Sequence, residues 1–426
     1  MNIKKIPQHK INHMKIAVIG AGISGLSAAH FLSKKYKVDL FEKNDHFGGH
    51  AYTVEVPSHN FEETISLDLG FIVFNKINYP NLVNLFDQLK INYEKSDMSF
   101  SVSVKNSNIE YSGSGLKGLF SNKYNIFNID FIRMIKEIIF FYKIADSMNK
   151  ENIQKQTLGD FLKSKKMSDY FIRFHIIPMV SAIWSMSTNQ AYKMPMSLFI
   201  NFFQNHGLFK IRNRPQWYTV SGRSKTYVKK ILETISGEYF KNYKIKNILR
   251  NKNGVRLYYG SANEYFEYDK VVFAVHADEI LELINNPTEN EKKILKNFQY
   301  KKNIAYLHED DRLMPNNKKA WSSWNSILDK TNENKICVTY WLNKLQNLET
   351  KKNYFLTLNP FMTIKNSKII KKVAFTHPFY DIQTISAQKY LSELQGVNNS
   401  YFCGSYFGYG FHEDGLNSGI DVSNKL

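Results

Sequence analysis

Apolar residues form two kinds of run along this chain. Residues 15–19 (KIAVI), 37–41 (KVDLF) and 270–275 (KVVFAV) are short and mostly β-branched, which is typical of strands buried in a parallel sheet. Residues 26–34 (LSAAHFLSK) have helical spacing, with small residues where a helix must lie close to a sheet. The pattern predicts a strand–helix–strand unit of about 30 residues near the start of the chain.

Longer segments with helical apolar spacing follow this unit. They are residues 131–145, 158–163, 170–178 and 196–203, and many of their apolar residues are aromatic. Residues 336–342 have the pattern of a strand within a later region that mixes strands and helices. The chain therefore combines an α/β pattern at its start with a mixed pattern in its interior.

The turn after the first strand has the sequence GAGISG, which places Gly20, Gly22 and Gly25 in the G-x-G-x-x-G spacing. The first glycine permits a tight turn, the second lets the backbone approach a pyrophosphate, and the third allows close helix–strand packing. The helix N-terminus offers N–H groups to the phosphates. Glu42 lies about 20 residues further on, where an acid accepts hydrogen bonds from a ribose diol. These features predict a dinucleotide site.

Further glycines after Glu42 indicate a ligand longer than NAD. Residues 43–50 (KNDHFGGH) contain the pair Gly48 and Gly49, and Gly70 lies at another strand-like turn. A second close approach of the backbone fits FAD, whose extended body runs past the first strand–helix–strand unit. The spacing therefore favours FAD.

The same glycine spacing recurs at Gly113, Gly115 and Gly118 (GSGLKG). Here it follows only a short run at residues 109–111, the chain turns polar soon after Gly118, and no strand ending in an acid follows. We therefore expect one dinucleotide, FAD, and no dedicated NAD(P)H domain. Residues 113–118 are interpreted as a turn.

Several motifs resemble the amine-oxidase and phytoene-desaturase superfamily of FAD enzymes. These are residues 20–32 (GAGISGLSAAHFL), 38–50 (VDLFEKNDHFGGH), 67–75 (LDLGFIVFN), 401–404 (YFCG) and 414–419 (DGLNSG). Residues 98–104, 182–185, 205–209, 214–217, 339–346 and 404–416 resemble a bacterial subgroup described as predicted NAD/FAD-binding proteins. Members of that subgroup are linked to membrane fatty-acid modification, so the resemblance implies a lipophilic substrate.

The resemblance implies an α/β, amine-oxidase-like fold with a discontinuous Rossmann-like FAD-binding domain and an α+β substrate domain. The expected FAD-binding domain comprises residues 14–75, 214–285 and 397–426, and the substrate domain comprises 76–213 and 286–396. Residues 1–13 are expected to be a disordered basic extension. The residues predicted to bind the cofactor are Gly20, Gly22, Ile23, Ser24, Gly25, Glu42, Lys43, Gly48, Gly49, His50, Gly70, Phe71, Ile245, Gly404, Asp414, Gly415 and Leu416.

Two positions depart from the superfamily pattern. Ser405 follows Gly404 where the superfamily often has an acid for the ribityl chain, and Asp414 is the expected substitute. Gly222 and Arg223 stand where a glycine pair is usual, which puts the expected local turn in question.

Flavin chemistry requires few protein side chains, because the cofactor itself accepts the hydride. The protein binds and orients the cofactor and the substrate, and it excludes water. Tyr409 and His412 precede the expected flavin-binding helix and are the candidate catalytic residues, with packing beneath the flavin as the alternative. Cys403 is interpreted as a buried thiol rather than a flavin attachment site. Residues 308–311 (HEDD) are interpreted as a surface loop rather than a metal site. We expect Trp321 and Trp324 to pack in the core, and the alternative is that they line a substrate tunnel.

Composition limits the compartment and the partners. The 426 residues include two cysteines and carry a net charge of +19. Two distant cysteines argue against a disulfide scaffold or a zinc site and fit a reducing compartment. No apolar stretch reaches the roughly 18 residues needed to span a bilayer. We expect a cytoplasmic protein of open oligomeric state.

The basic charge suggests an anionic partner. A membrane surface is favoured over nucleic acid because no nucleic-acid motif is present. Abundant Lys and Asn throughout the chain are the alternative explanation for the charge. Residues 131–145 are amphipathic and fit either the membrane surface or the interior of the substrate domain. Membrane contact would place the protein at the inner face of the membrane.

Three functions remain open from the sequence. The leading hypothesis is an FAD-dependent dehydrogenase or desaturase that removes a hydride from a lipophilic chain. The second is a flavin amine oxidase, which a strongly basic chain fits less well. The third is a flavin-stabilised module that binds a membrane or nucleic acid without catalysis.

Overall fold

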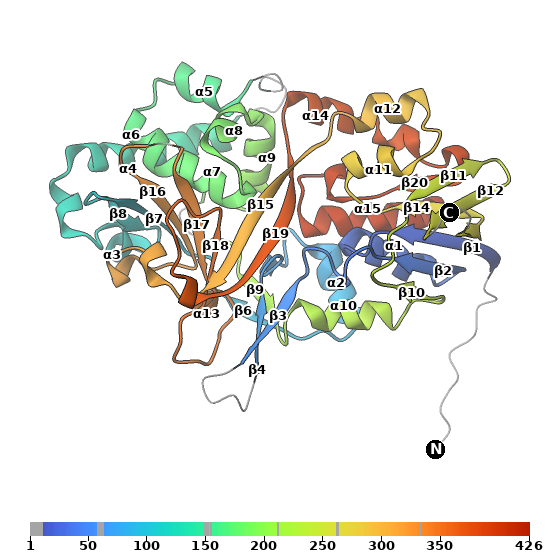
Figure 1. Cartoon of the computed structure of the whole chain (residues 1–426). Helices are drawn as coiled ribbons and strands as arrows, with labels where there is room; N and C mark the ends of the chain where they lie inside the picture. The colour runs from blue at the N-terminus through green and yellow to red at the C-terminus, as the bar shows by residue number, and fades with distance from the viewer. Residues whose placement is uncertain are drawn as a thin grey trace.

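The computed structural model describes residues 12–57, 64–148, 153, 156–210, 213–260, 264–332 and 334–426. The molecule has two halves, each built around its own large sheet (Figure 1). The extension expected at residues 1–13 falls mainly on residues 1–11, which lie outside the described residues. Asn12 already begins the first strand.

A five-stranded parallel sheet forms the centre of the half at the right of Figure 1. In spatial order it consists of β10 (Tyr239–Phe240), β2 (Tyr36–Phe41), β1 (Asn12–Ile19), β14 (Lys270–Phe273) and β20 (Ser400–Phe402). Ile16 of β1 is completely buried and aligns with Val38 on one side and Lys270 on the other. The predicted buried parallel strands are confirmed.

Helices surround this sheet. They are α1 (Ile23–Leu32), α2 (Pro80–Gln88), α10 (Ser224–Leu232), α11 (Ala277–Leu283), α12 (Glu289–Leu295), α14 (Ile382–Gln388) and α15 (His412–Lys425). Helices α1 and α15 pack very closely, because a Cβ atom on Gly419 would lie 2.5 Å from the Ser24 carbonyl oxygen. The Ser27 hydroxyl also donates to the Leu416 carbonyl at 2.8 Å. This packing holds the start of both helices at the carboxyl edge of the sheet.

Three smaller sheets complete this side of the molecule and its junction with the other half. They are β11 (Asn247–Asn251), β12 (Gly254–Tyr259) and β13 (Glu264–Tyr268); β3 (Thr53–Pro57) and β4 (Thr64–Asp68); and β5 (Phe74–Asn75), β9 (Trp217–Val220) and β6 (Tyr93–Ser96).

A seven-stranded sheet forms the centre of the other half. Its order is β19 (Ile369–Phe379), β15 (Gln299–His308), β18 (Phe355–Leu358), β17 (Ile336–Trp341), β16 (Trp324–Asp329), β7 (Phe100–Lys105) and β8 (Glu110–Ser112). All neighbours are antiparallel except β16 and β7. Strands β15 and β19 lie between the two halves (Figure 1).

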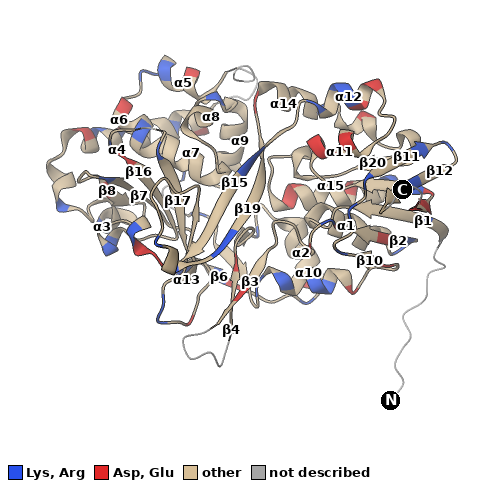
Figure 2. Ribbon diagram, viewed as in Figure 1, with Lys and Arg blue, Asp and Glu red and all other residues tan. Residues whose placement is uncertain are grey.

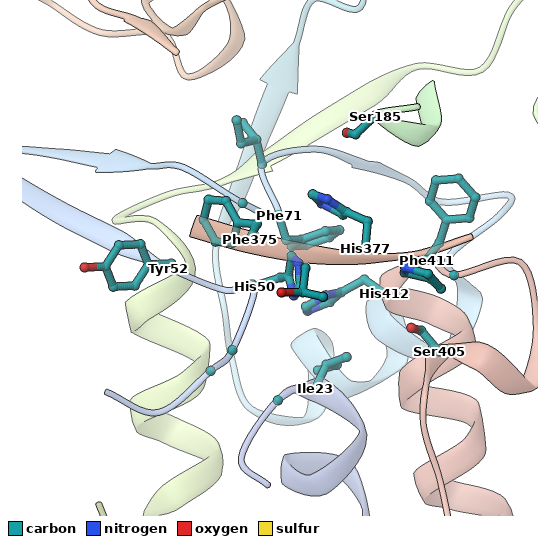
Figure 3. Close-up of a pocket in the computed structure, with 18 of the residues that line it drawn as sticks. Ile23, His50, Tyr52, Phe71, Ser185, Phe375, His377, Ser405, Phe411 and His412 are labelled. Carbon is teal, nitrogen blue, oxygen red and sulfur yellow. The ribbon is translucent and has the colours of Figure 1, made fainter. Parts of the chain in front are cut away.

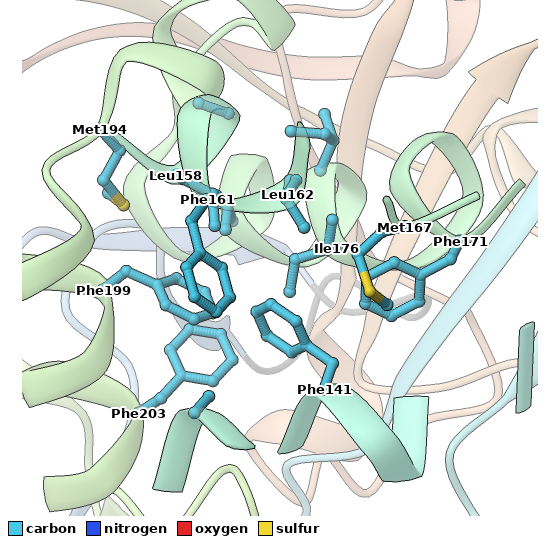
Figure 4. Close-up of a cluster of buried hydrophobic side chains, with 14 of the residues drawn as sticks. Phe141, Leu158, Phe161, Leu162, Met167, Phe171, Ile176, Met194, Phe199 and Phe203 are labelled. Atoms are coloured by element: carbon cyan, nitrogen blue, oxygen red, sulfur yellow. The ribbon is translucent and has the colours of Figure 1, made fainter. Parts of the chain in front are cut away.

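The helices of this half enclose an aromatic core. They are α3 (Gly115–Leu119), α4 (Ile129–Asp146), α5 (Leu158–Ser164), α6 (Asp169–Phe171), α7 (Ile177–Trp184), α8 (Thr188–Lys193) and α9 (Met196–Asn205), while α13 (Leu342–Leu345) follows β17. Figure 4 shows Phe141, Phe161 and Phe199 meeting at the centre, with ring centroids of Phe141 and Phe161 5.9 Å apart. The predicted helices at 131–145, 158–163 and 196–203 are confirmed.

The segment predicted to be helical at 170–178 is helical throughout, but it is not a regular α-helix. Helix α6 ends at Phe171, a π-helical turn covers Ile172–Ile176, and α7 begins at Ile177. Pro178 has no N–H to donate to the Phe174 carbonyl. The Tyr111 hydroxyl donates to that carbonyl instead, at 2.8 Å.

The interpretation of residues 308–311 as a surface loop is also wrong. His308 and Asp310 are completely buried. His308 Nε2 lies 2.7 Å from Thr357 Oγ1, and Arg312 Nε donates to Asp310 at 2.9 Å. The Arg312 guanidinium holds the pKa of Asp310 well below its usual range. In the part of the chain that the structure describes, no group of His, Cys, Asp and Glu is placed to bind a metal.

Within the described ranges, no helix combines the length and the apolar character needed to cross a bilayer.

Candidate functional site

A cavity of about 1120 Å³ lies between the two halves and is lined by residues from both. We call one part of the cavity its nucleotide half, and its lining includes Gly20, Gly22, Glu42, Gly49, Ile245 and Ser405. The part we call the apolar half is lined by Met98, Phe100, Trp324, Tyr340, Leu356 and Phe375, among others. The two parts belong to one continuous space, so ligands in them would meet.

The glycine turn between β1 and α1 confirms the predicted roles of its first and third glycines. Gly20 has φ of +98°, and a Cβ atom there would lie 2.7 Å from the Ala274 carbonyl oxygen. A Cβ atom on Gly25 would lie only 1.9 Å from the Gly20 carbonyl oxygen. Gly20 and Gly25 are therefore required by the turn and by close packing.

Gly22 differs from both of these glycines. Its φ of −69° suits any residue, and a Cβ atom there would meet nothing within 4 Å. The protein's own packing therefore does not explain this glycine. Gly22 is also the N-cap of α1, which has neither a side-chain cap nor an acid in its first turn. Gly22, Ile23 and Ser24 line the cavity, so the start of α1 lies at its wall, where a helix N-terminus can bind an anion.

Glu42 lies at the end of β2 and is almost completely buried. Its Oε2 accepts a hydrogen bond from the Ala21 backbone N–H at 2.9 Å, and its Oε1 accepts from the Asn44 N–H at 2.9 Å. The carboxylate is thereby oriented at the cavity wall and ties β2 to the glycine turn. Lys43 also lines the cavity, and its ammonium pairs with Glu279 of α11 at 2.8 Å.

The second glycine pair packs directly on the first glycine turn. The Gly48 N–H donates to the Ala21 carbonyl at 2.8 Å. A Cβ atom on Gly49 would lie 3.1 Å from Gly22 Cα. The two turns together form one backbone surface, which agrees with their predicted contact with one ligand.

His50 and Phe71 connect the nucleotide half to the apolar half (Figure 3). The Phe71 N–H donates to the His50 carbonyl at 2.8 Å, and a Cβ atom on Gly70 would lie 2.0 Å from that oxygen. The His50 ring stacks on Phe375, with centroids 5.2 Å apart, and lies 5.0 Å from the His377 ring.

Burial keeps these imidazoles neutral. It lowers the pKa of His50 well below its ordinary value, and it lowers the pKa of His377 to about 4. His50 Nε2 is buried and has no hydrogen-bond partner among the described residues. An unsatisfied buried nitrogen is costly, so its position beside the cavity is consistent with a missing ligand.

The C-terminal segment reaches the cavity with fewer of its predicted residues. Gly404 and Ser405 line it. Asp414 does not line it. The expectation that Asp414 replaces the acid usual at the position of Ser405 is therefore wrong, and the contacts of Asp414 give the reason. Its Oδ2 accepts from the Tyr409 and Phe411 N–H groups at 3.0 and 2.9 Å. The carboxylate thus caps its own helix, and burial raises its pKa to about 6.

Gly415 and Leu416, which were also predicted to bind the cofactor, do not line the cavity. A Cβ atom on Gly415 would lie 2.8 Å from Ile23 Cγ2, so this glycine serves the contact between α15 and α1. Leu416 is completely buried in the core of the same half. Ile245 does line the cavity, beside Tyr243 and Lys244.

Both candidate catalytic residues lie at the cavity. His412 is buried, stacks on Phe71 with centroids 3.8 Å apart, and has Nε2 2.8 Å from the Tyr227 hydroxyl. Burial lowers the pKa of His412 to about 3. Tyr409 is half-buried, and burial raises its pKa. These contacts orient His412 firmly, and its role in proton transfer stays a prediction.

The apolar half draws on residues that the sequence did not single out. They include Met179, Trp184 and Phe202 from α7 and α9, and Val373, Phe375 and His377 from β19. Trp324 lines this half, whereas Trp321 donates its Nε1–H to the Pro315 carbonyl at 2.8 Å and packs outside it. Two signals in the sequence indicated this wall. All six segments of the subgroup resemblance supply residues to the cavity wall, and Trp324 lines it as the tunnel alternative for that residue implied.

The remaining candidates lie elsewhere. Both cysteines are buried, and burial raises the pKa of the Cys403 thiol, so Cys403 lacks the exposed thiolate that flavin attachment needs. Gly115 begins the short helix α3, away from the cavity-lining residues. The second G-x-G-x-x-G therefore does not join the nucleotide half.

Arg223, at the position where a glycine pair was expected, keeps the positive backbone angle that a glycine would adopt. Its φ is +73° and that of Gly222 is +76°. The side chain offsets this strain by donating to the Ser66 carbonyl at 3.0 Å and the Gln346 carbonyl at 2.8 Å. Gly222 and Arg223 therefore both adopt the positive φ angles that favour glycine.

Comparison with known proteins agrees with this architecture. Residues 18–89 match the family described as NAD(P)-binding Rossmann-like domain. A 1-hydroxycarotenoid 3,4-desaturase from Flavobacterium sp. (strain P99-3) is 41% identical over 76 residues, which cover 18% of this chain and 14% of that relative.

Solved structures match over nearly the whole length. The cyclohexylamine oxidase of Brevibacterium oxydans aligns with a TM-score of 0.68 and 13% identity, covering 97% of this chain and 98% of that one. A fatty acid isomerase from P. acnes that produces CLA aligns with a TM-score of 0.65 and 13% identity, covering 97% and 98%. The chain therefore has the α/β fold of the amine oxidases of known structure.

Proposed function

We propose that this protein is an FAD-dependent oxidoreductase that removes a hydride from a lipophilic substrate. The observation that carries the proposal is the single cavity in which a dinucleotide-type glycine surface opens directly into an apolar chamber. The similarity of this chain to the 1-hydroxycarotenoid 3,4-desaturase and its resemblance to the bacterial subgroup both support a lipophilic substrate.

The residues of the nucleotide half fit FAD. The open space at Gly22 and the uncapped start of α1 suit the pyrophosphate, and the Glu42 carboxylate lies where a ribose would be held. Bound FAD supplies the hydride acceptor for the reaction. The chain supplies position and exclusion of water, with His50 and Phe71 at the junction where the substrate's reacting C–H bond would be placed.

The apolar half argues for a chain or ring of hydrocarbon rather than a cationic amine. Among the described residues lining this half, Asp97 is a carboxylate, but Lys344 lies 3.4 Å from it and Ser323 donates to it at 2.7 Å. Arg214 also lines the cavity and would repel an ammonium group. We propose an allylic or similarly activated C–H bond as the site of oxidation, because an unactivated alkane is a poor hydride donor.

A fatty acyl chain of a membrane lipid is the finer form of the proposal. It rests on the subgroup resemblance and on the apolar lining of the part of the cavity that lies outside the nucleotide half. An amine oxidase is the second candidate, favoured by the likeness in fold to cyclohexylamine oxidase.

The test is anaerobic mixing of the purified flavoprotein with separated lipid classes and, in parallel, with primary and secondary amines. The proposal predicts that a lipid class bleaches the flavin absorbance and that amines leave it unchanged. Bleaching by amines alone would contradict it.

A further inference from the structure

Large apolar side chains that face solvent are concentrated in one short stretch of the chain. Seven of the twelve exposed large hydrophobic residues among those described fall between residues 116 and 140. We call them the outer patch: Leu116, Tyr124, Ile126, Phe127, Ile129, Ile139 and Phe140. Phe127 and Ile129 are each 84% exposed. Scattered exposed apolar residues need no explanation, but a concentration of this kind marks an interaction surface.

The patch residues come from three adjoining segments, which are α3, the turn Lys123–Phe127 and α4. Phe120 at the end of α3 packs on Phe131 at the start of α4, with ring centroids 6.2 Å apart. Asn125 donates its side-chain N–H to the Leu119 carbonyl at 3.2 Å, which ties the turn to α3. Figure 1 places α3 and α4 at the end of the molecule remote from the five-stranded sheet.

Helix α4 has two apolar faces with different surroundings. Phe131, Met134 and Phe141 are completely buried in the aromatic core. The opposite face follows the helical spacing 129, 133, 136, 140 and 143, and it alternates apolar Ile129 and Phe140 with Arg133, Lys136 and Lys143, all of them exposed. Core packing accounts for the first face and leaves the second unexplained.

Basic residues surround the outer patch. The 31-residue span 113–143 contains five exposed basic residues, which are Lys117, Lys123, Arg133, Lys136 and Lys143. Its exposed acidic residue is Asp130. Figure 2 shows basic positions on both α3 and α4. Apolar side chains flanked by Lys and Arg are the composition of surfaces that insert into the headgroup region of an anionic bilayer, where the long basic side chains reach the phosphates.

We infer that the outer patch docks this protein on the surface of an anionic phospholipid bilayer. A second copy of the chain is a poorer occupant, because a symmetric contact would bring the same basic side chains face to face. The inference concerns where the molecule sits and does not depend on the reaction. Vesicle binding is measured without turnover, so its failure and the failure of the proposed function are separate outcomes.

The experiment is sedimentation of the flavoprotein with vesicles of phosphatidylcholine alone or mixed with phosphatidylglycerol. We expect binding to the mixed vesicles that weakens with salt, and little binding to phosphatidylcholine. Replacing three lysines (Lys117→Gln, Lys123→Gln and Lys136→Gln) should reduce affinity on the order of 100-fold, since each basic side chain near such a surface contributes about fivefold. The matched control Lys37→Gln, Lys229→Gln and Lys389→Gln changes the net charge equally on exposed sites of other elements and should bind nearly as the parent does.

The apolar contribution has its own pair of variants. Phe127→Ser with Ile129→Ser should reduce binding to mixed vesicles at least tenfold, whereas Ile77→Ser with Tyr390→Ser, which removes exposed apolar groups elsewhere, should not. Equal loss in both pairs, or equal binding to neutral and anionic vesicles, would overturn the inference. A third result would also overturn the inference. In it the parent binds no vesicles but forms a dimer in solution, and Phe127→Ser with Ile129→Ser dissociates that dimer.

Discussion

At the scale of single residues, Gly22 separates a requirement of the ligand from a requirement of the fold. Gly20 and Gly25 would collide with backbone if they carried a Cβ atom, but Gly22 would not. The three glycines share one motif in the sequence and look equivalent there. In the structure only Gly22 has free space in front of it, and this space lies at the start of α1.

Gly22→Val should therefore fold and lose FAD. We expect the flavin-free variant to differ from the flavin-free parent by less than about 1 kcal/mol in unfolding free energy, the usual size of a changed N-cap. FAD affinity should fall on the order of 100-fold, about 2.7 kcal/mol, because the side chain occupies the space of the phosphates. Fluorescence titration with FAD measures this loss.

Gly25→Ala is the control for Gly22→Val. Its Cβ atom would lie 1.9 Å from the Gly20 carbonyl oxygen, so the protein itself should be destabilised. If Gly22→Val retains the parent's FAD affinity, the pyrophosphate does not lie at this turn.

His175 provides a residue-scale prediction about pH. It is buried between the Tyr111 and Tyr142 hydroxyls, 3.0 Å from each, and burial lowers its pKa to about 3 from 6.5. The unfolded chain thus takes up the proton first as pH falls, so the folded state loses stability below about pH 6.5. Arg214 acts in the same direction by disfavouring a second positive charge.

His175→Gln removes this titration while keeping groups that can bond to both hydroxyls. Relative to the variant, the parent should lose about 2 kcal/mol of unfolding free energy between about pH 7 and about pH 5. Urea denaturation of both proteins at the two pH values gives the difference. A difference that does not change with pH would show that His175 has the same pKa in the fold as in the unfolded chain, and would contradict this prediction.

At the scale of elements, two arginines of the small sheet β11–β13 form ion pairs with glutamates, one pair buried and the other exposed. Arg250 and Glu291 are 0% and 1% exposed and lie 2.7 Å apart. Arg256 and Glu267 are 48% and 63% exposed and lie 3.0 Å apart. The buried pair joins β11 to α12, and Arg250 also donates to Ser400 of β20 at 3.0 Å.

Glu291→Gln should cost about 3–5 kcal/mol of unfolding free energy, because it leaves the Arg250 guanidinium uncompensated in the interior. Glu267→Gln should cost less than about 1 kcal/mol, as exposed pairs contribute little. Chemical denaturation measures both. Similar small losses in the two variants would mean that water reaches Arg250.

The sequence predicted the elements whose local pattern decides their structure. The parallel strands, the glycine turn and the helices in the aromatic core follow from residues close together in the chain. The helix at 170–178 was predicted, but its π-helical turn was not, because the partner of the Phe174 carbonyl is Tyr111, which is distant in sequence. Residues 308–311 were misplaced because their polar groups find partners in Thr357 and Arg312.

The site shows the same division. Gly20 and Gly22 of the glycine motif, Glu42 and His50 line the cavity as expected, whereas Gly25 packs behind the turn. Asp414 does not line the cavity, because a carboxylate at this place in α15 satisfies its own helix N-terminus more directly. The apolar wall from β19 and α9 depends on how the two halves meet, and no short motif encodes that.

At the scale of the whole molecule, the large cavity is lined by residues of the first glycine motif and by none of residues 113–118. The second glycine motif lies in the half that carries the aromatic core, and part of it belongs to the outer patch. Electrons would therefore enter from the substrate. Basic residues are spread over both halves (Figure 2), whereas exposed apolar residues are concentrated at one end.

This organisation predicts that NADH and NADPH do not reduce the flavin at a useful rate. Without oxygen, neither nicotinamide should bleach the flavin absorbance within the time in which a lipid substrate does. Stopped-flow absorbance with each reductant gives the comparison.

The most direct test of the central claim is a single turnover without oxygen, with the flavoprotein in excess over a purified lipid. The account predicts that the flavin bleached equals the lipid that has lost two hydrogen atoms, counted by mass spectrometry. Bleaching by amines or by NADPH alone, with every lipid recovered unchanged, would contradict it.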